Sequence, residues 1–174
     1  MEYEAQKRMI YRIRLGHWRF TFTIAPVSTV IGVNSNLPNG KHILMWDFDE
    51  THIEEVEIEL QRVQRTYQLP TIYIMQTKKD TNFIAYCYQQ TEWRKAVEII
   101  TYTQGVDWGF IKFGVFRGHF TLRVTPKHGR KIRLVRTLPS TVKSDCTLYD
   151  LKSWVQYDTL FDNVLTKVRE VAVK

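Results

Sequence analysis

Residues 43–49 read Ile43-Leu44-Met45-Trp46-Asp47-Phe48-Asp49, an apolar run that ends in two aspartates two positions apart. Such a run is typical of a buried strand, which we predict over residues 42–48. Side chains at i and i+2 of a strand point to the same side, so both carboxylates can face one cation. Carboxylate pairs suit Mg²⁺ or Mn²⁺, which prefer oxygen ligands. The alternative role of the two acids is to cap the helix that follows.

The segment after this strand has the period of a helix. Thr51 and Glu54 have capping-box spacing, in which a hydroxyl and a carboxylate satisfy the first amides of a helix. Apolar residues then recur at steps of three and four, and Pro70 ends the pattern. The residues on this predicted helical face are Ile53, Val56, Leu60, Val63 and Tyr67.

The order of the predicted elements indicates a fold class. After the first helix we expect a strand over 71–77, a polar turn over 78–82, a strand over 83–88, a helix from Thr91 to Gly105, and strands over 108–116, 119–124 and 132–138. Residues 42–124 therefore spell β-α-β-β-α-β, an α+β class with a ferredoxin-like or RRM-like palm core. Because this fold hosts many unrelated functions, the function must be argued from the site.

The two ends of the chain add to this core. Residues 18–24 alternate apolar and polar side chains, which predicts an additional N-terminal strand, and residues 3–15 read as a short helix or an extended arm. Apolar residues at roughly helical spacing between Leu151 and Val171 predict a C-terminal helix. We expect one domain over residues 1–174, with the core in 40–140 and additions in 1–39 and 141–174.

Charge and composition narrow the function classes. The chain has 174 residues and a net charge of +7, and its Ile111–Lys143 stretch holds nine Lys or Arg and no Asp or Glu. Such a stretch fits phosphate-rich partners, and an aromatic content of 13% suits either a bulky core or a surface on which bases stack. Two cysteines exclude a disulfide scaffold. With no signal-peptide pattern and no membrane-spanning run, we expect a cytoplasmic protein without a membrane partner.

Several residues are candidates for the site around Asp47 and Asp49. Asp107 stands just before the predicted fourth strand and is the candidate third carboxylate; its alternative role is that of a turn residue after Gly105. Lys78 and Lys79 occupy the predicted hairpin turn, where they can contact phosphate or lie in solvent. The other phosphate-binding candidates are Arg117, Arg123, Lys127, Arg130 and Lys131.

On these residues the chain resembles the archaeo-eukaryotic primase superfamily, the primase-polymerases of plasmids, phages and archaea. Residues 43–49 resemble its first motif, residues 71–88 its second-motif hairpin, and Asp107 falls where a third acid is expected. The resemblance implies a nucleotidyltransferase of DNA replication in which Asp47, Asp49 and Asp107 bind Mg²⁺ or Mn²⁺. It also implies DNA, single-stranded or as template and primer, and nucleoside triphosphates as partners, with a helicase or other replication protein as an open further partner.

Two alternatives remain beside this interpretation. The predicted hairpin has no histidine, which the second motif of the family supplies, so the same fold can instead be a non-catalytic module that binds single strands. The second alternative starts from Asp47-Phe48-Asp49-Glu50-Thr51, which resembles the first motif of haloacid-dehalogenase-type phosphatases. That fold needs parallel strands joined by crossover helices, whereas the residues from Trp108 to Leu138 read as consecutive strands.

Overall fold

The computed structural model describes residues 8–127, 129–160 and 166–173. The chain divides into two compact units, one from Ile31 to Gln156 and the other from the segments before and after it. In the described part of the chain, none of the helices is both long and apolar enough to cross a membrane. The candidate site residues all belong to the unit Ile31–Gln156.

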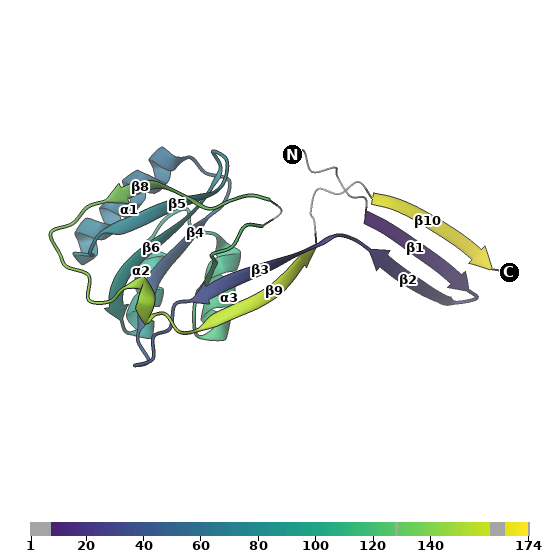
Figure 1. The fold of residues 1–174 in the computed structure, drawn as a ribbon, viewed down its shortest axis with the longest axis horizontal. Helices are drawn as coiled ribbons and strands as arrows, with labels where there is room; N and C mark the ends of the chain where they lie inside the picture. The colour runs from purple at the N-terminus through teal and green to yellow at the C-terminus, as the bar shows by residue number, and fades with distance from the viewer. Residues whose placement is uncertain (1–7, 128, 161–165, 174) are drawn as a thin grey trace. The chain divides into compact units, whose positions relative to one another are not determined.

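A four-stranded antiparallel sheet forms the centre of this unit (Figure 1). Its strands are β4 (His42–Phe48), β5 (Ile72–Lys78), β6 (Asn82–Thr91) and β8 (Arg133–Leu138), in the order β4-β6-β5-β8. The predicted strand over residues 42–48 is present with these bounds, and the residues from Ile43 to Trp46 are completely buried. The uninterrupted apolar run thus marks a strand that is covered on both faces.

Two helices pack against this sheet, α1 (Ile53–Tyr67) and α2 (Trp93–Tyr102). The predicted face of α1 is confirmed, since Val56, Leu60 and Val63 are buried in the core. The predicted cap differs: His52 is the N-cap residue, and the Thr51 hydroxyl donates to Glu55 Oε2 at 2.9 Å. The helix ends where Gln68 adopts a left-handed conformation before Pro70.

The expected strand over 108–116 is wrong, because these residues form the helix α3 (Trp108–Arg117). The aromatic and β-branched content favours a strand, but capping residues mark both ends of a helix. The Asp107 carboxylate accepts a hydrogen bond from the Phe110 amide at 2.6 Å, and Gly118 terminates the helix with a φ of 75°. A short strand follows, β7 (Thr121–Arg123), which pairs antiparallel with β3 (Val27–Asn34).

The expected C-terminal helix is also wrong. The chain instead forms the short 3-10 turn η1 (Leu148–Asp150) and the strands β9 (Trp154–Leu160) and β10 (Thr166–Val173). Strand β10 pairs in parallel with β1 (Arg8–Leu15), with Ile10 opposite Val168. The valine-rich sequence of β10 suits such a ladder. Of the positions that suggested the helix, Val164 lies outside the described residues.

The N-terminal segment forms strands. Residues 8–15, for which a short helix or an extended arm was open, form β1, and residues 3–7 lie outside the described part. The strand expected over residues 18–24 is confirmed as β2 (Trp18–Ile24), which pairs antiparallel with β1. The α+β class predicted from the sequence is confirmed, with β1, β2 and β3 as additional N-terminal strands.

Candidate functional site

Asp47 and Asp49 lie at the end of β4. The indole Nε1 of Trp46 donates to the Thr103 hydroxyl at 2.9 Å, which directs Trp46 towards the end of α2. Because neighbouring side chains of a strand point to opposite faces, Asp47 points to the face away from that helix. Asp47 is partly buried and Asp49 is exposed.

Asp107 lies next to these two residues in space, although it is distant from them in the sequence. Its backbone amide donates to the Asp47 carbonyl oxygen at 2.8 Å, so the start of α3 is fastened to the end of β4. The sequence placed Asp107 before a strand, whereas it is the N-cap residue of a helix. The structure therefore brings the three predicted acids together, although through a different element.

The charges of the cluster act on Asp47. Burial first, and then the nearby charges of Asp49 and Asp107, raise the pKa of its carboxyl group to about 7, while Arg123 opposes them. Like charges that share a partly buried site disfavour ionisation. A cation placed beside these carboxylates would relieve this repulsion, which is the physical reason why such a donor set can attract one.

The fit of this cluster to a metal ion follows from its donors. All three side chains offer carboxylate oxygens, which Mg²⁺ and Mn²⁺ prefer. Two of them also have protein partners: Asp49 Oδ1 accepts a hydrogen bond from the Asn82 side-chain amide, and Asp107 Oδ1 accepts from the Phe110 amide. Within residues 8–127, 129–160 and 166–173, no group of three or more His, Cys, Asp or Glu side chains is placed so that it could hold a metal ion. The donor chemistry fits a hard cation, and the side chains would have to turn to hold it.

A basic hollow of about 490 Å³ lies at the turn between β5 and β6. Its lining combines the hairpin with the segment that precedes β8, and five of its side chains are cationic. The charged residues of this basic hollow are Lys78, Lys79, Asp80, Arg130, Lys131 and Arg133. Four of the predicted phosphate-binding residues, Lys78, Lys79, Arg130 and Lys131, thus meet in one place from two distant segments.

Arg123 contacts the lining of the basic hollow and is also close enough to Asp47 to act on its charge. Its guanidinium donates to the Thr77 carbonyl oxygen at 2.9 Å and to the Thr125 carbonyl oxygen at 3.2 Å, which holds the end of β7 beside the end of β5. Its charge also lowers the pKa of Asp47.

Two other predicted residues lie elsewhere. Arg117 is the last residue of α3, and its guanidinium lies over the Phe113 ring at 5.6 Å from the ring centre. The backbones of Lys127 and Arg130 pair with each other in a tight turn. Neither Arg117 nor Lys127 lines the basic hollow.

Three residues of the site were not singled out from the sequence. Arg133 lines the basic hollow, Asn82 contacts Asp49, and the buried hydroxyl of Tyr86 lies near Asp47, whose charge helps to raise the pKa of Tyr86 after burial and Tyr88. The signal for Asn82 and Tyr86 is strand register, because β6 pairs antiparallel with β4 and places Phe83 opposite Phe48. For Arg133, the only signal in the sequence is that it belongs to the basic stretch Ile111–Lys143.

Comparisons of this chain with protein-family models, with curated proteins and with solved structures find no match. The chemistry open to the site therefore follows from its own residues. Three carboxylates, an arginine that lies beside them and a hollow with five cationic side chains offer the donor types that hard cations and phosphates prefer.

Proposed function

We propose that this chain is a primase-polymerase-like nucleotidyltransferase that acts in DNA replication, of the kind that mobile elements such as plasmids and phages encode. The observation that carries the proposal is that Asp47, Asp49 and Asp107 come together beside Arg123 and the basic hollow. Acids that can hold a divalent cation next to bases that can hold phosphate are what phosphoryl transfer requires.

The arrangement of the elements supports a ferredoxin-like palm core within this proposal. The elements β4, α1, β5, β6 and α2 follow each other in the order β-α-β-β-α, and β6 lies between β4 and β5. This is how the third strand of a β-α-β-β-α-β core lies between the first two. The likeness covers β4 to α2, because α3 follows where the fourth strand of that core would come.

Each part of the site has a role in this proposal. Asp47, Asp49 and Asp107 would hold Mg²⁺ or Mn²⁺, which when bound activates the attacking hydroxyl and neutralises charge on the phosphates. Lys78, Lys79, Arg130 and Lys131 would hold the triphosphate or the template backbone through their charges. Arg123 would contact phosphate beside these two groups.

Primer extension tests the proposal directly. Purified protein with a labelled primer, its DNA template, deoxynucleoside triphosphates and Mg²⁺ or Mn²⁺ should extend the primer. Asp47→Ala should reduce incorporation by about 10²-fold or more, because such a cation contributes several kcal/mol of charge stabilisation. Glu50→Gln is the matched control, since it removes an exposed charge of the same sign next to the motif. Absence of metal-dependent incorporation by the wild-type protein would refute the enzymatic part.

A second candidate function is a non-catalytic module that binds single strands. The observations that favour it are the protein partners that Asp49 and Asp107 already have and the lack of a histidine in the β5–β6 hairpin. In this case the protein should bind single strands with a strong dependence on salt, and Asp47→Ala should bind as tightly as wild type. Incorporation that depends on Asp47 would exclude it.

The phosphatase alternative gains no support from the sheet that carries Asp47. Every pairing of β4, β5, β6 and β8 is antiparallel, whereas a phosphatase of the haloacid-dehalogenase type is built on a parallel sheet. Hydrolysis of a small chromogenic phosphate that is lost in Asp47→Asn would reinstate this alternative.

A further inference from the structure

The helix α3 has one face that is fixed by packing. The rings of Phe110 and Phe120 stack with their centres 5.0 Å apart, and Gly114 leaves room for the Phe120 ring. Phe120 is completely buried. Positions 110 and 114 are one turn apart, so they define the inner face of α3.

The outer face of α3 carries large apolar side chains that no part of the described chain covers. Trp108 is 71% exposed and Phe116 is 87% exposed. Trp108, Lys112, Val115 and Phe116 recur at steps of four, three and one, which places them on one side of the helix, opposite Phe110 and Gly114. We call these four residues the outer face of α3, and Phe113 lies on its flank.

The charged residues of α3 are both cations, and Lys112 is the one on the outer face. Lys112 lies between the two exposed aromatic rings along the helix, and the Arg117 guanidinium lies over the ring of Phe113. Residues 108–117 include no Asp or Glu. Two aromatic rings with a cation between them match a ligand that presents flat rings and negative charges in turn.

We propose that the outer face of α3 binds a single strand of nucleic acid, with bases stacked on Trp108 and Phe116 and a phosphate at Lys112. Trp108 and Phe116 are eight residues apart, about 12 Å along a helix, which leaves room for roughly three bases at stacked spacing. Stacking on exposed aromatic side chains together with a basic surface is how proteins hold single strands without reading their sequence.

The position of α3 connects this face with the acidic cluster. Asp107 caps α3 and its amide donates to the Asp47 carbonyl oxygen, so the end of the outer face that begins with Trp108 lies next to the acidic cluster. The inference rests on the proposed function, for which it supplies the path of the template. It concerns binding alone, so it can be measured without metal or nucleotide.

Fluorescence anisotropy with a labelled oligothymidylate tests the binding. The double variant Trp108→Ala/Phe116→Ala should lose about 30-fold or more in affinity, because two base–aromatic stacks are removed. Trp108→Phe/Phe116→Tyr keeps both rings and should bind within about threefold of wild type. Tyr149→Ala is the matched control, since Tyr149 is an aromatic residue with 84% exposure on η1, outside α3.

Tryptophan fluorescence gives a second readout that a merely structural role would not move. The oligothymidylate should quench part of the intrinsic emission of wild-type protein, and Trp108→Phe should lose that part while the affinity is retained. Unchanged quenching in Trp108→Phe, or unchanged affinity in the double alanine variant, would overturn the inference.

Other partners would give different results. Binding to vesicles of phosphatidylglycerol that disappears in the double alanine variant, without an effect on the oligonucleotide, would show a membrane surface instead. Self-association in sedimentation that the same variant abolishes would show a second copy of the chain. Either result overturns the inference.

The result also separates this inference from the proposed function. If the double alanine variant extends primers and binds template like wild type while Asp47→Ala does not extend them, the inference fails and the proposed function stands. If the variant loses binding but wild-type protein incorporates no nucleotide, the enzymatic proposal fails and the outer face of α3 remains a binding surface.

Discussion

Asp47 is an acid whose ionisation opposes folding. Its pKa rises from 3.8 to about 7 in the folded chain, first through burial and then through the charges of Asp49 and Asp107. Between these two values the folded state binds more protons than the unfolded state. Stability that Asp47 contributes is therefore complete below about pH 3.8 and is lost as the pH rises through about 7.

Asp47→Asn should remove this pH dependence. The free energy of unfolding of the variant, measured in urea, should exceed that of wild type at pH 8, and the two should converge towards pH 4. The difference at pH 8 is expected to be on the order of 1–3 kcal/mol, since one pKa unit corresponds to about 1.4 kcal/mol and relaxation takes up part of the shift. Glu50→Gln is the control for removal of a neighbouring charge. Parallel pH profiles for Asp47→Asn and wild type would contradict the prediction.

The close packing of α3 against the Phe120 ring requires a glycine at position 114. A Cβ at this position would lie 2.3 Å from Cδ1 of Phe120, and the Phe120 ring is completely buried. Alanine is favoured over glycine in a helix by about 1 kcal/mol, but overpacking of a core costs about 1–3 kcal/mol. We expect Gly114→Ala to lower the free energy of unfolding by about 1–2 kcal/mol.

A double-mutant cycle checks the origin of this loss. Phe120→Leu removes the ring that the new methyl group would meet, so in that background Gly114→Ala should be neutral or stabilising. Urea unfolding of the two single variants and the double variant gives the coupling energy. Additive effects would show that Phe120 is not the cause.

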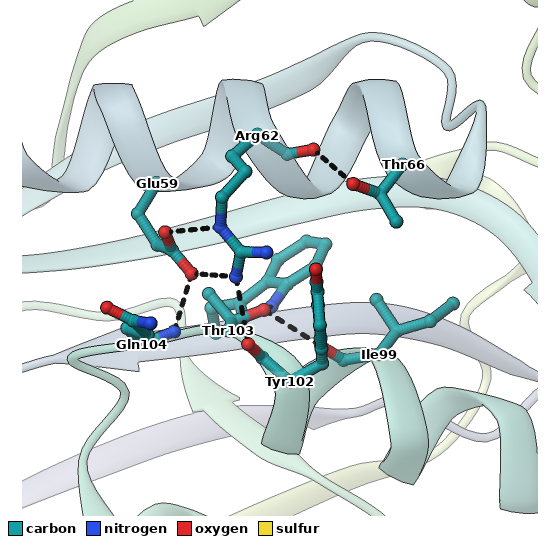
Figure 2. Close-up of polar contacts among 8 residues, drawn as sticks. Glu59, Arg62, Thr66, Ile99, Tyr102, Thr103 and Gln104 are labelled. Carbon is teal, nitrogen blue, oxygen red and sulfur yellow. Dashed lines mark hydrogen bonds and ion pairs between the residues drawn. The ribbon is translucent and has the colours of Figure 1, made fainter.

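At the scale of elements, α1 is joined to the end of α2 by a polar network (Figure 2). The Glu59 carboxylate accepts hydrogen bonds from Arg62 Nε at 2.8 Å and from the Gln104 amide at 2.7 Å. Arg62 Nη2 donates to the Tyr102 carbonyl oxygen at 3.0 Å, and its guanidinium lies over the Tyr102 ring. The hydrogen bond from Arg62, followed by that from the Gln104 amide, lowers the pKa of Glu59 despite its burial.

Glu59→Gln should weaken this junction. The amide cannot accept from all of these donors as the carboxylate does, so we expect a loss of about 1–2 kcal/mol in the free energy of unfolding at pH 7. Because the pKa of Glu59 is lowered by folding, the difference from wild type should shrink as the pH falls below about 4.5.

Glu57→Gln is the matched control on the same helix. Glu57 is joined to the half-exposed Arg136 at 3.3 Å, and an exposed ion pair of this kind contributes about 0–1 kcal/mol. If both substitutions cost the same amount, the network around Glu59 has no special role in holding the two helices together.

The helices and strands that could be predicted from the sequence are those in which the buried residues recur at the regular spacing of the element. The face from Ile53 to Tyr67 indicated α1 because one side is buried and the other is polar. In α3 this contrast is missing, since Trp108 and Phe116 are apolar and exposed, and the run resembles a strand. The capping residues Asp107 and Gly118 held the only local signal for a helix.

The candidate site was partly predictable for a related reason. Asp47 and Asp49 belong to one strand end, so their spacing alone places them together. The meeting of Lys78 and Lys79 with Arg130 and Lys131 depends on two segments that are distant in sequence, and the stretch could supply only the charge. The parallel pairing of β10 with β1 is non-local in the same way, and no periodicity within β10 reveals its partner.

At the scale of the whole molecule, the protein carries a net positive charge, and part of that charge is gathered at the site. The net charge of +7 and the acid-free stretch from Ile111 to Lys143 favour polyanions in general. The basic hollow concentrates five cationic side chains from two segments. A general attraction to the net charge and a specific contact between a lysine and a phosphate predict different salt dependences of binding when particular lysines are replaced.

The dependence of single-strand binding on salt distinguishes a general attraction from a specific contact with phosphate. In the proposed function Lys78 and Lys79 each neutralise a phosphate, so Lys78→Gln/Lys79→Gln should reduce the slope of log K against log salt by about 1.4, or about 0.7 for each phosphate that is no longer neutralised. Arg94→Gln/Lys95→Gln makes the same change of charge on α2, where Lys95 already pairs with Glu98 at 2.7 Å, and should leave the slope nearly unchanged. Titrations of a labelled oligonucleotide between low and moderate salt measure both slopes. Equal slopes for the two double variants would mean that the basic hollow acts only through the net charge of the protein and holds no phosphate of its own.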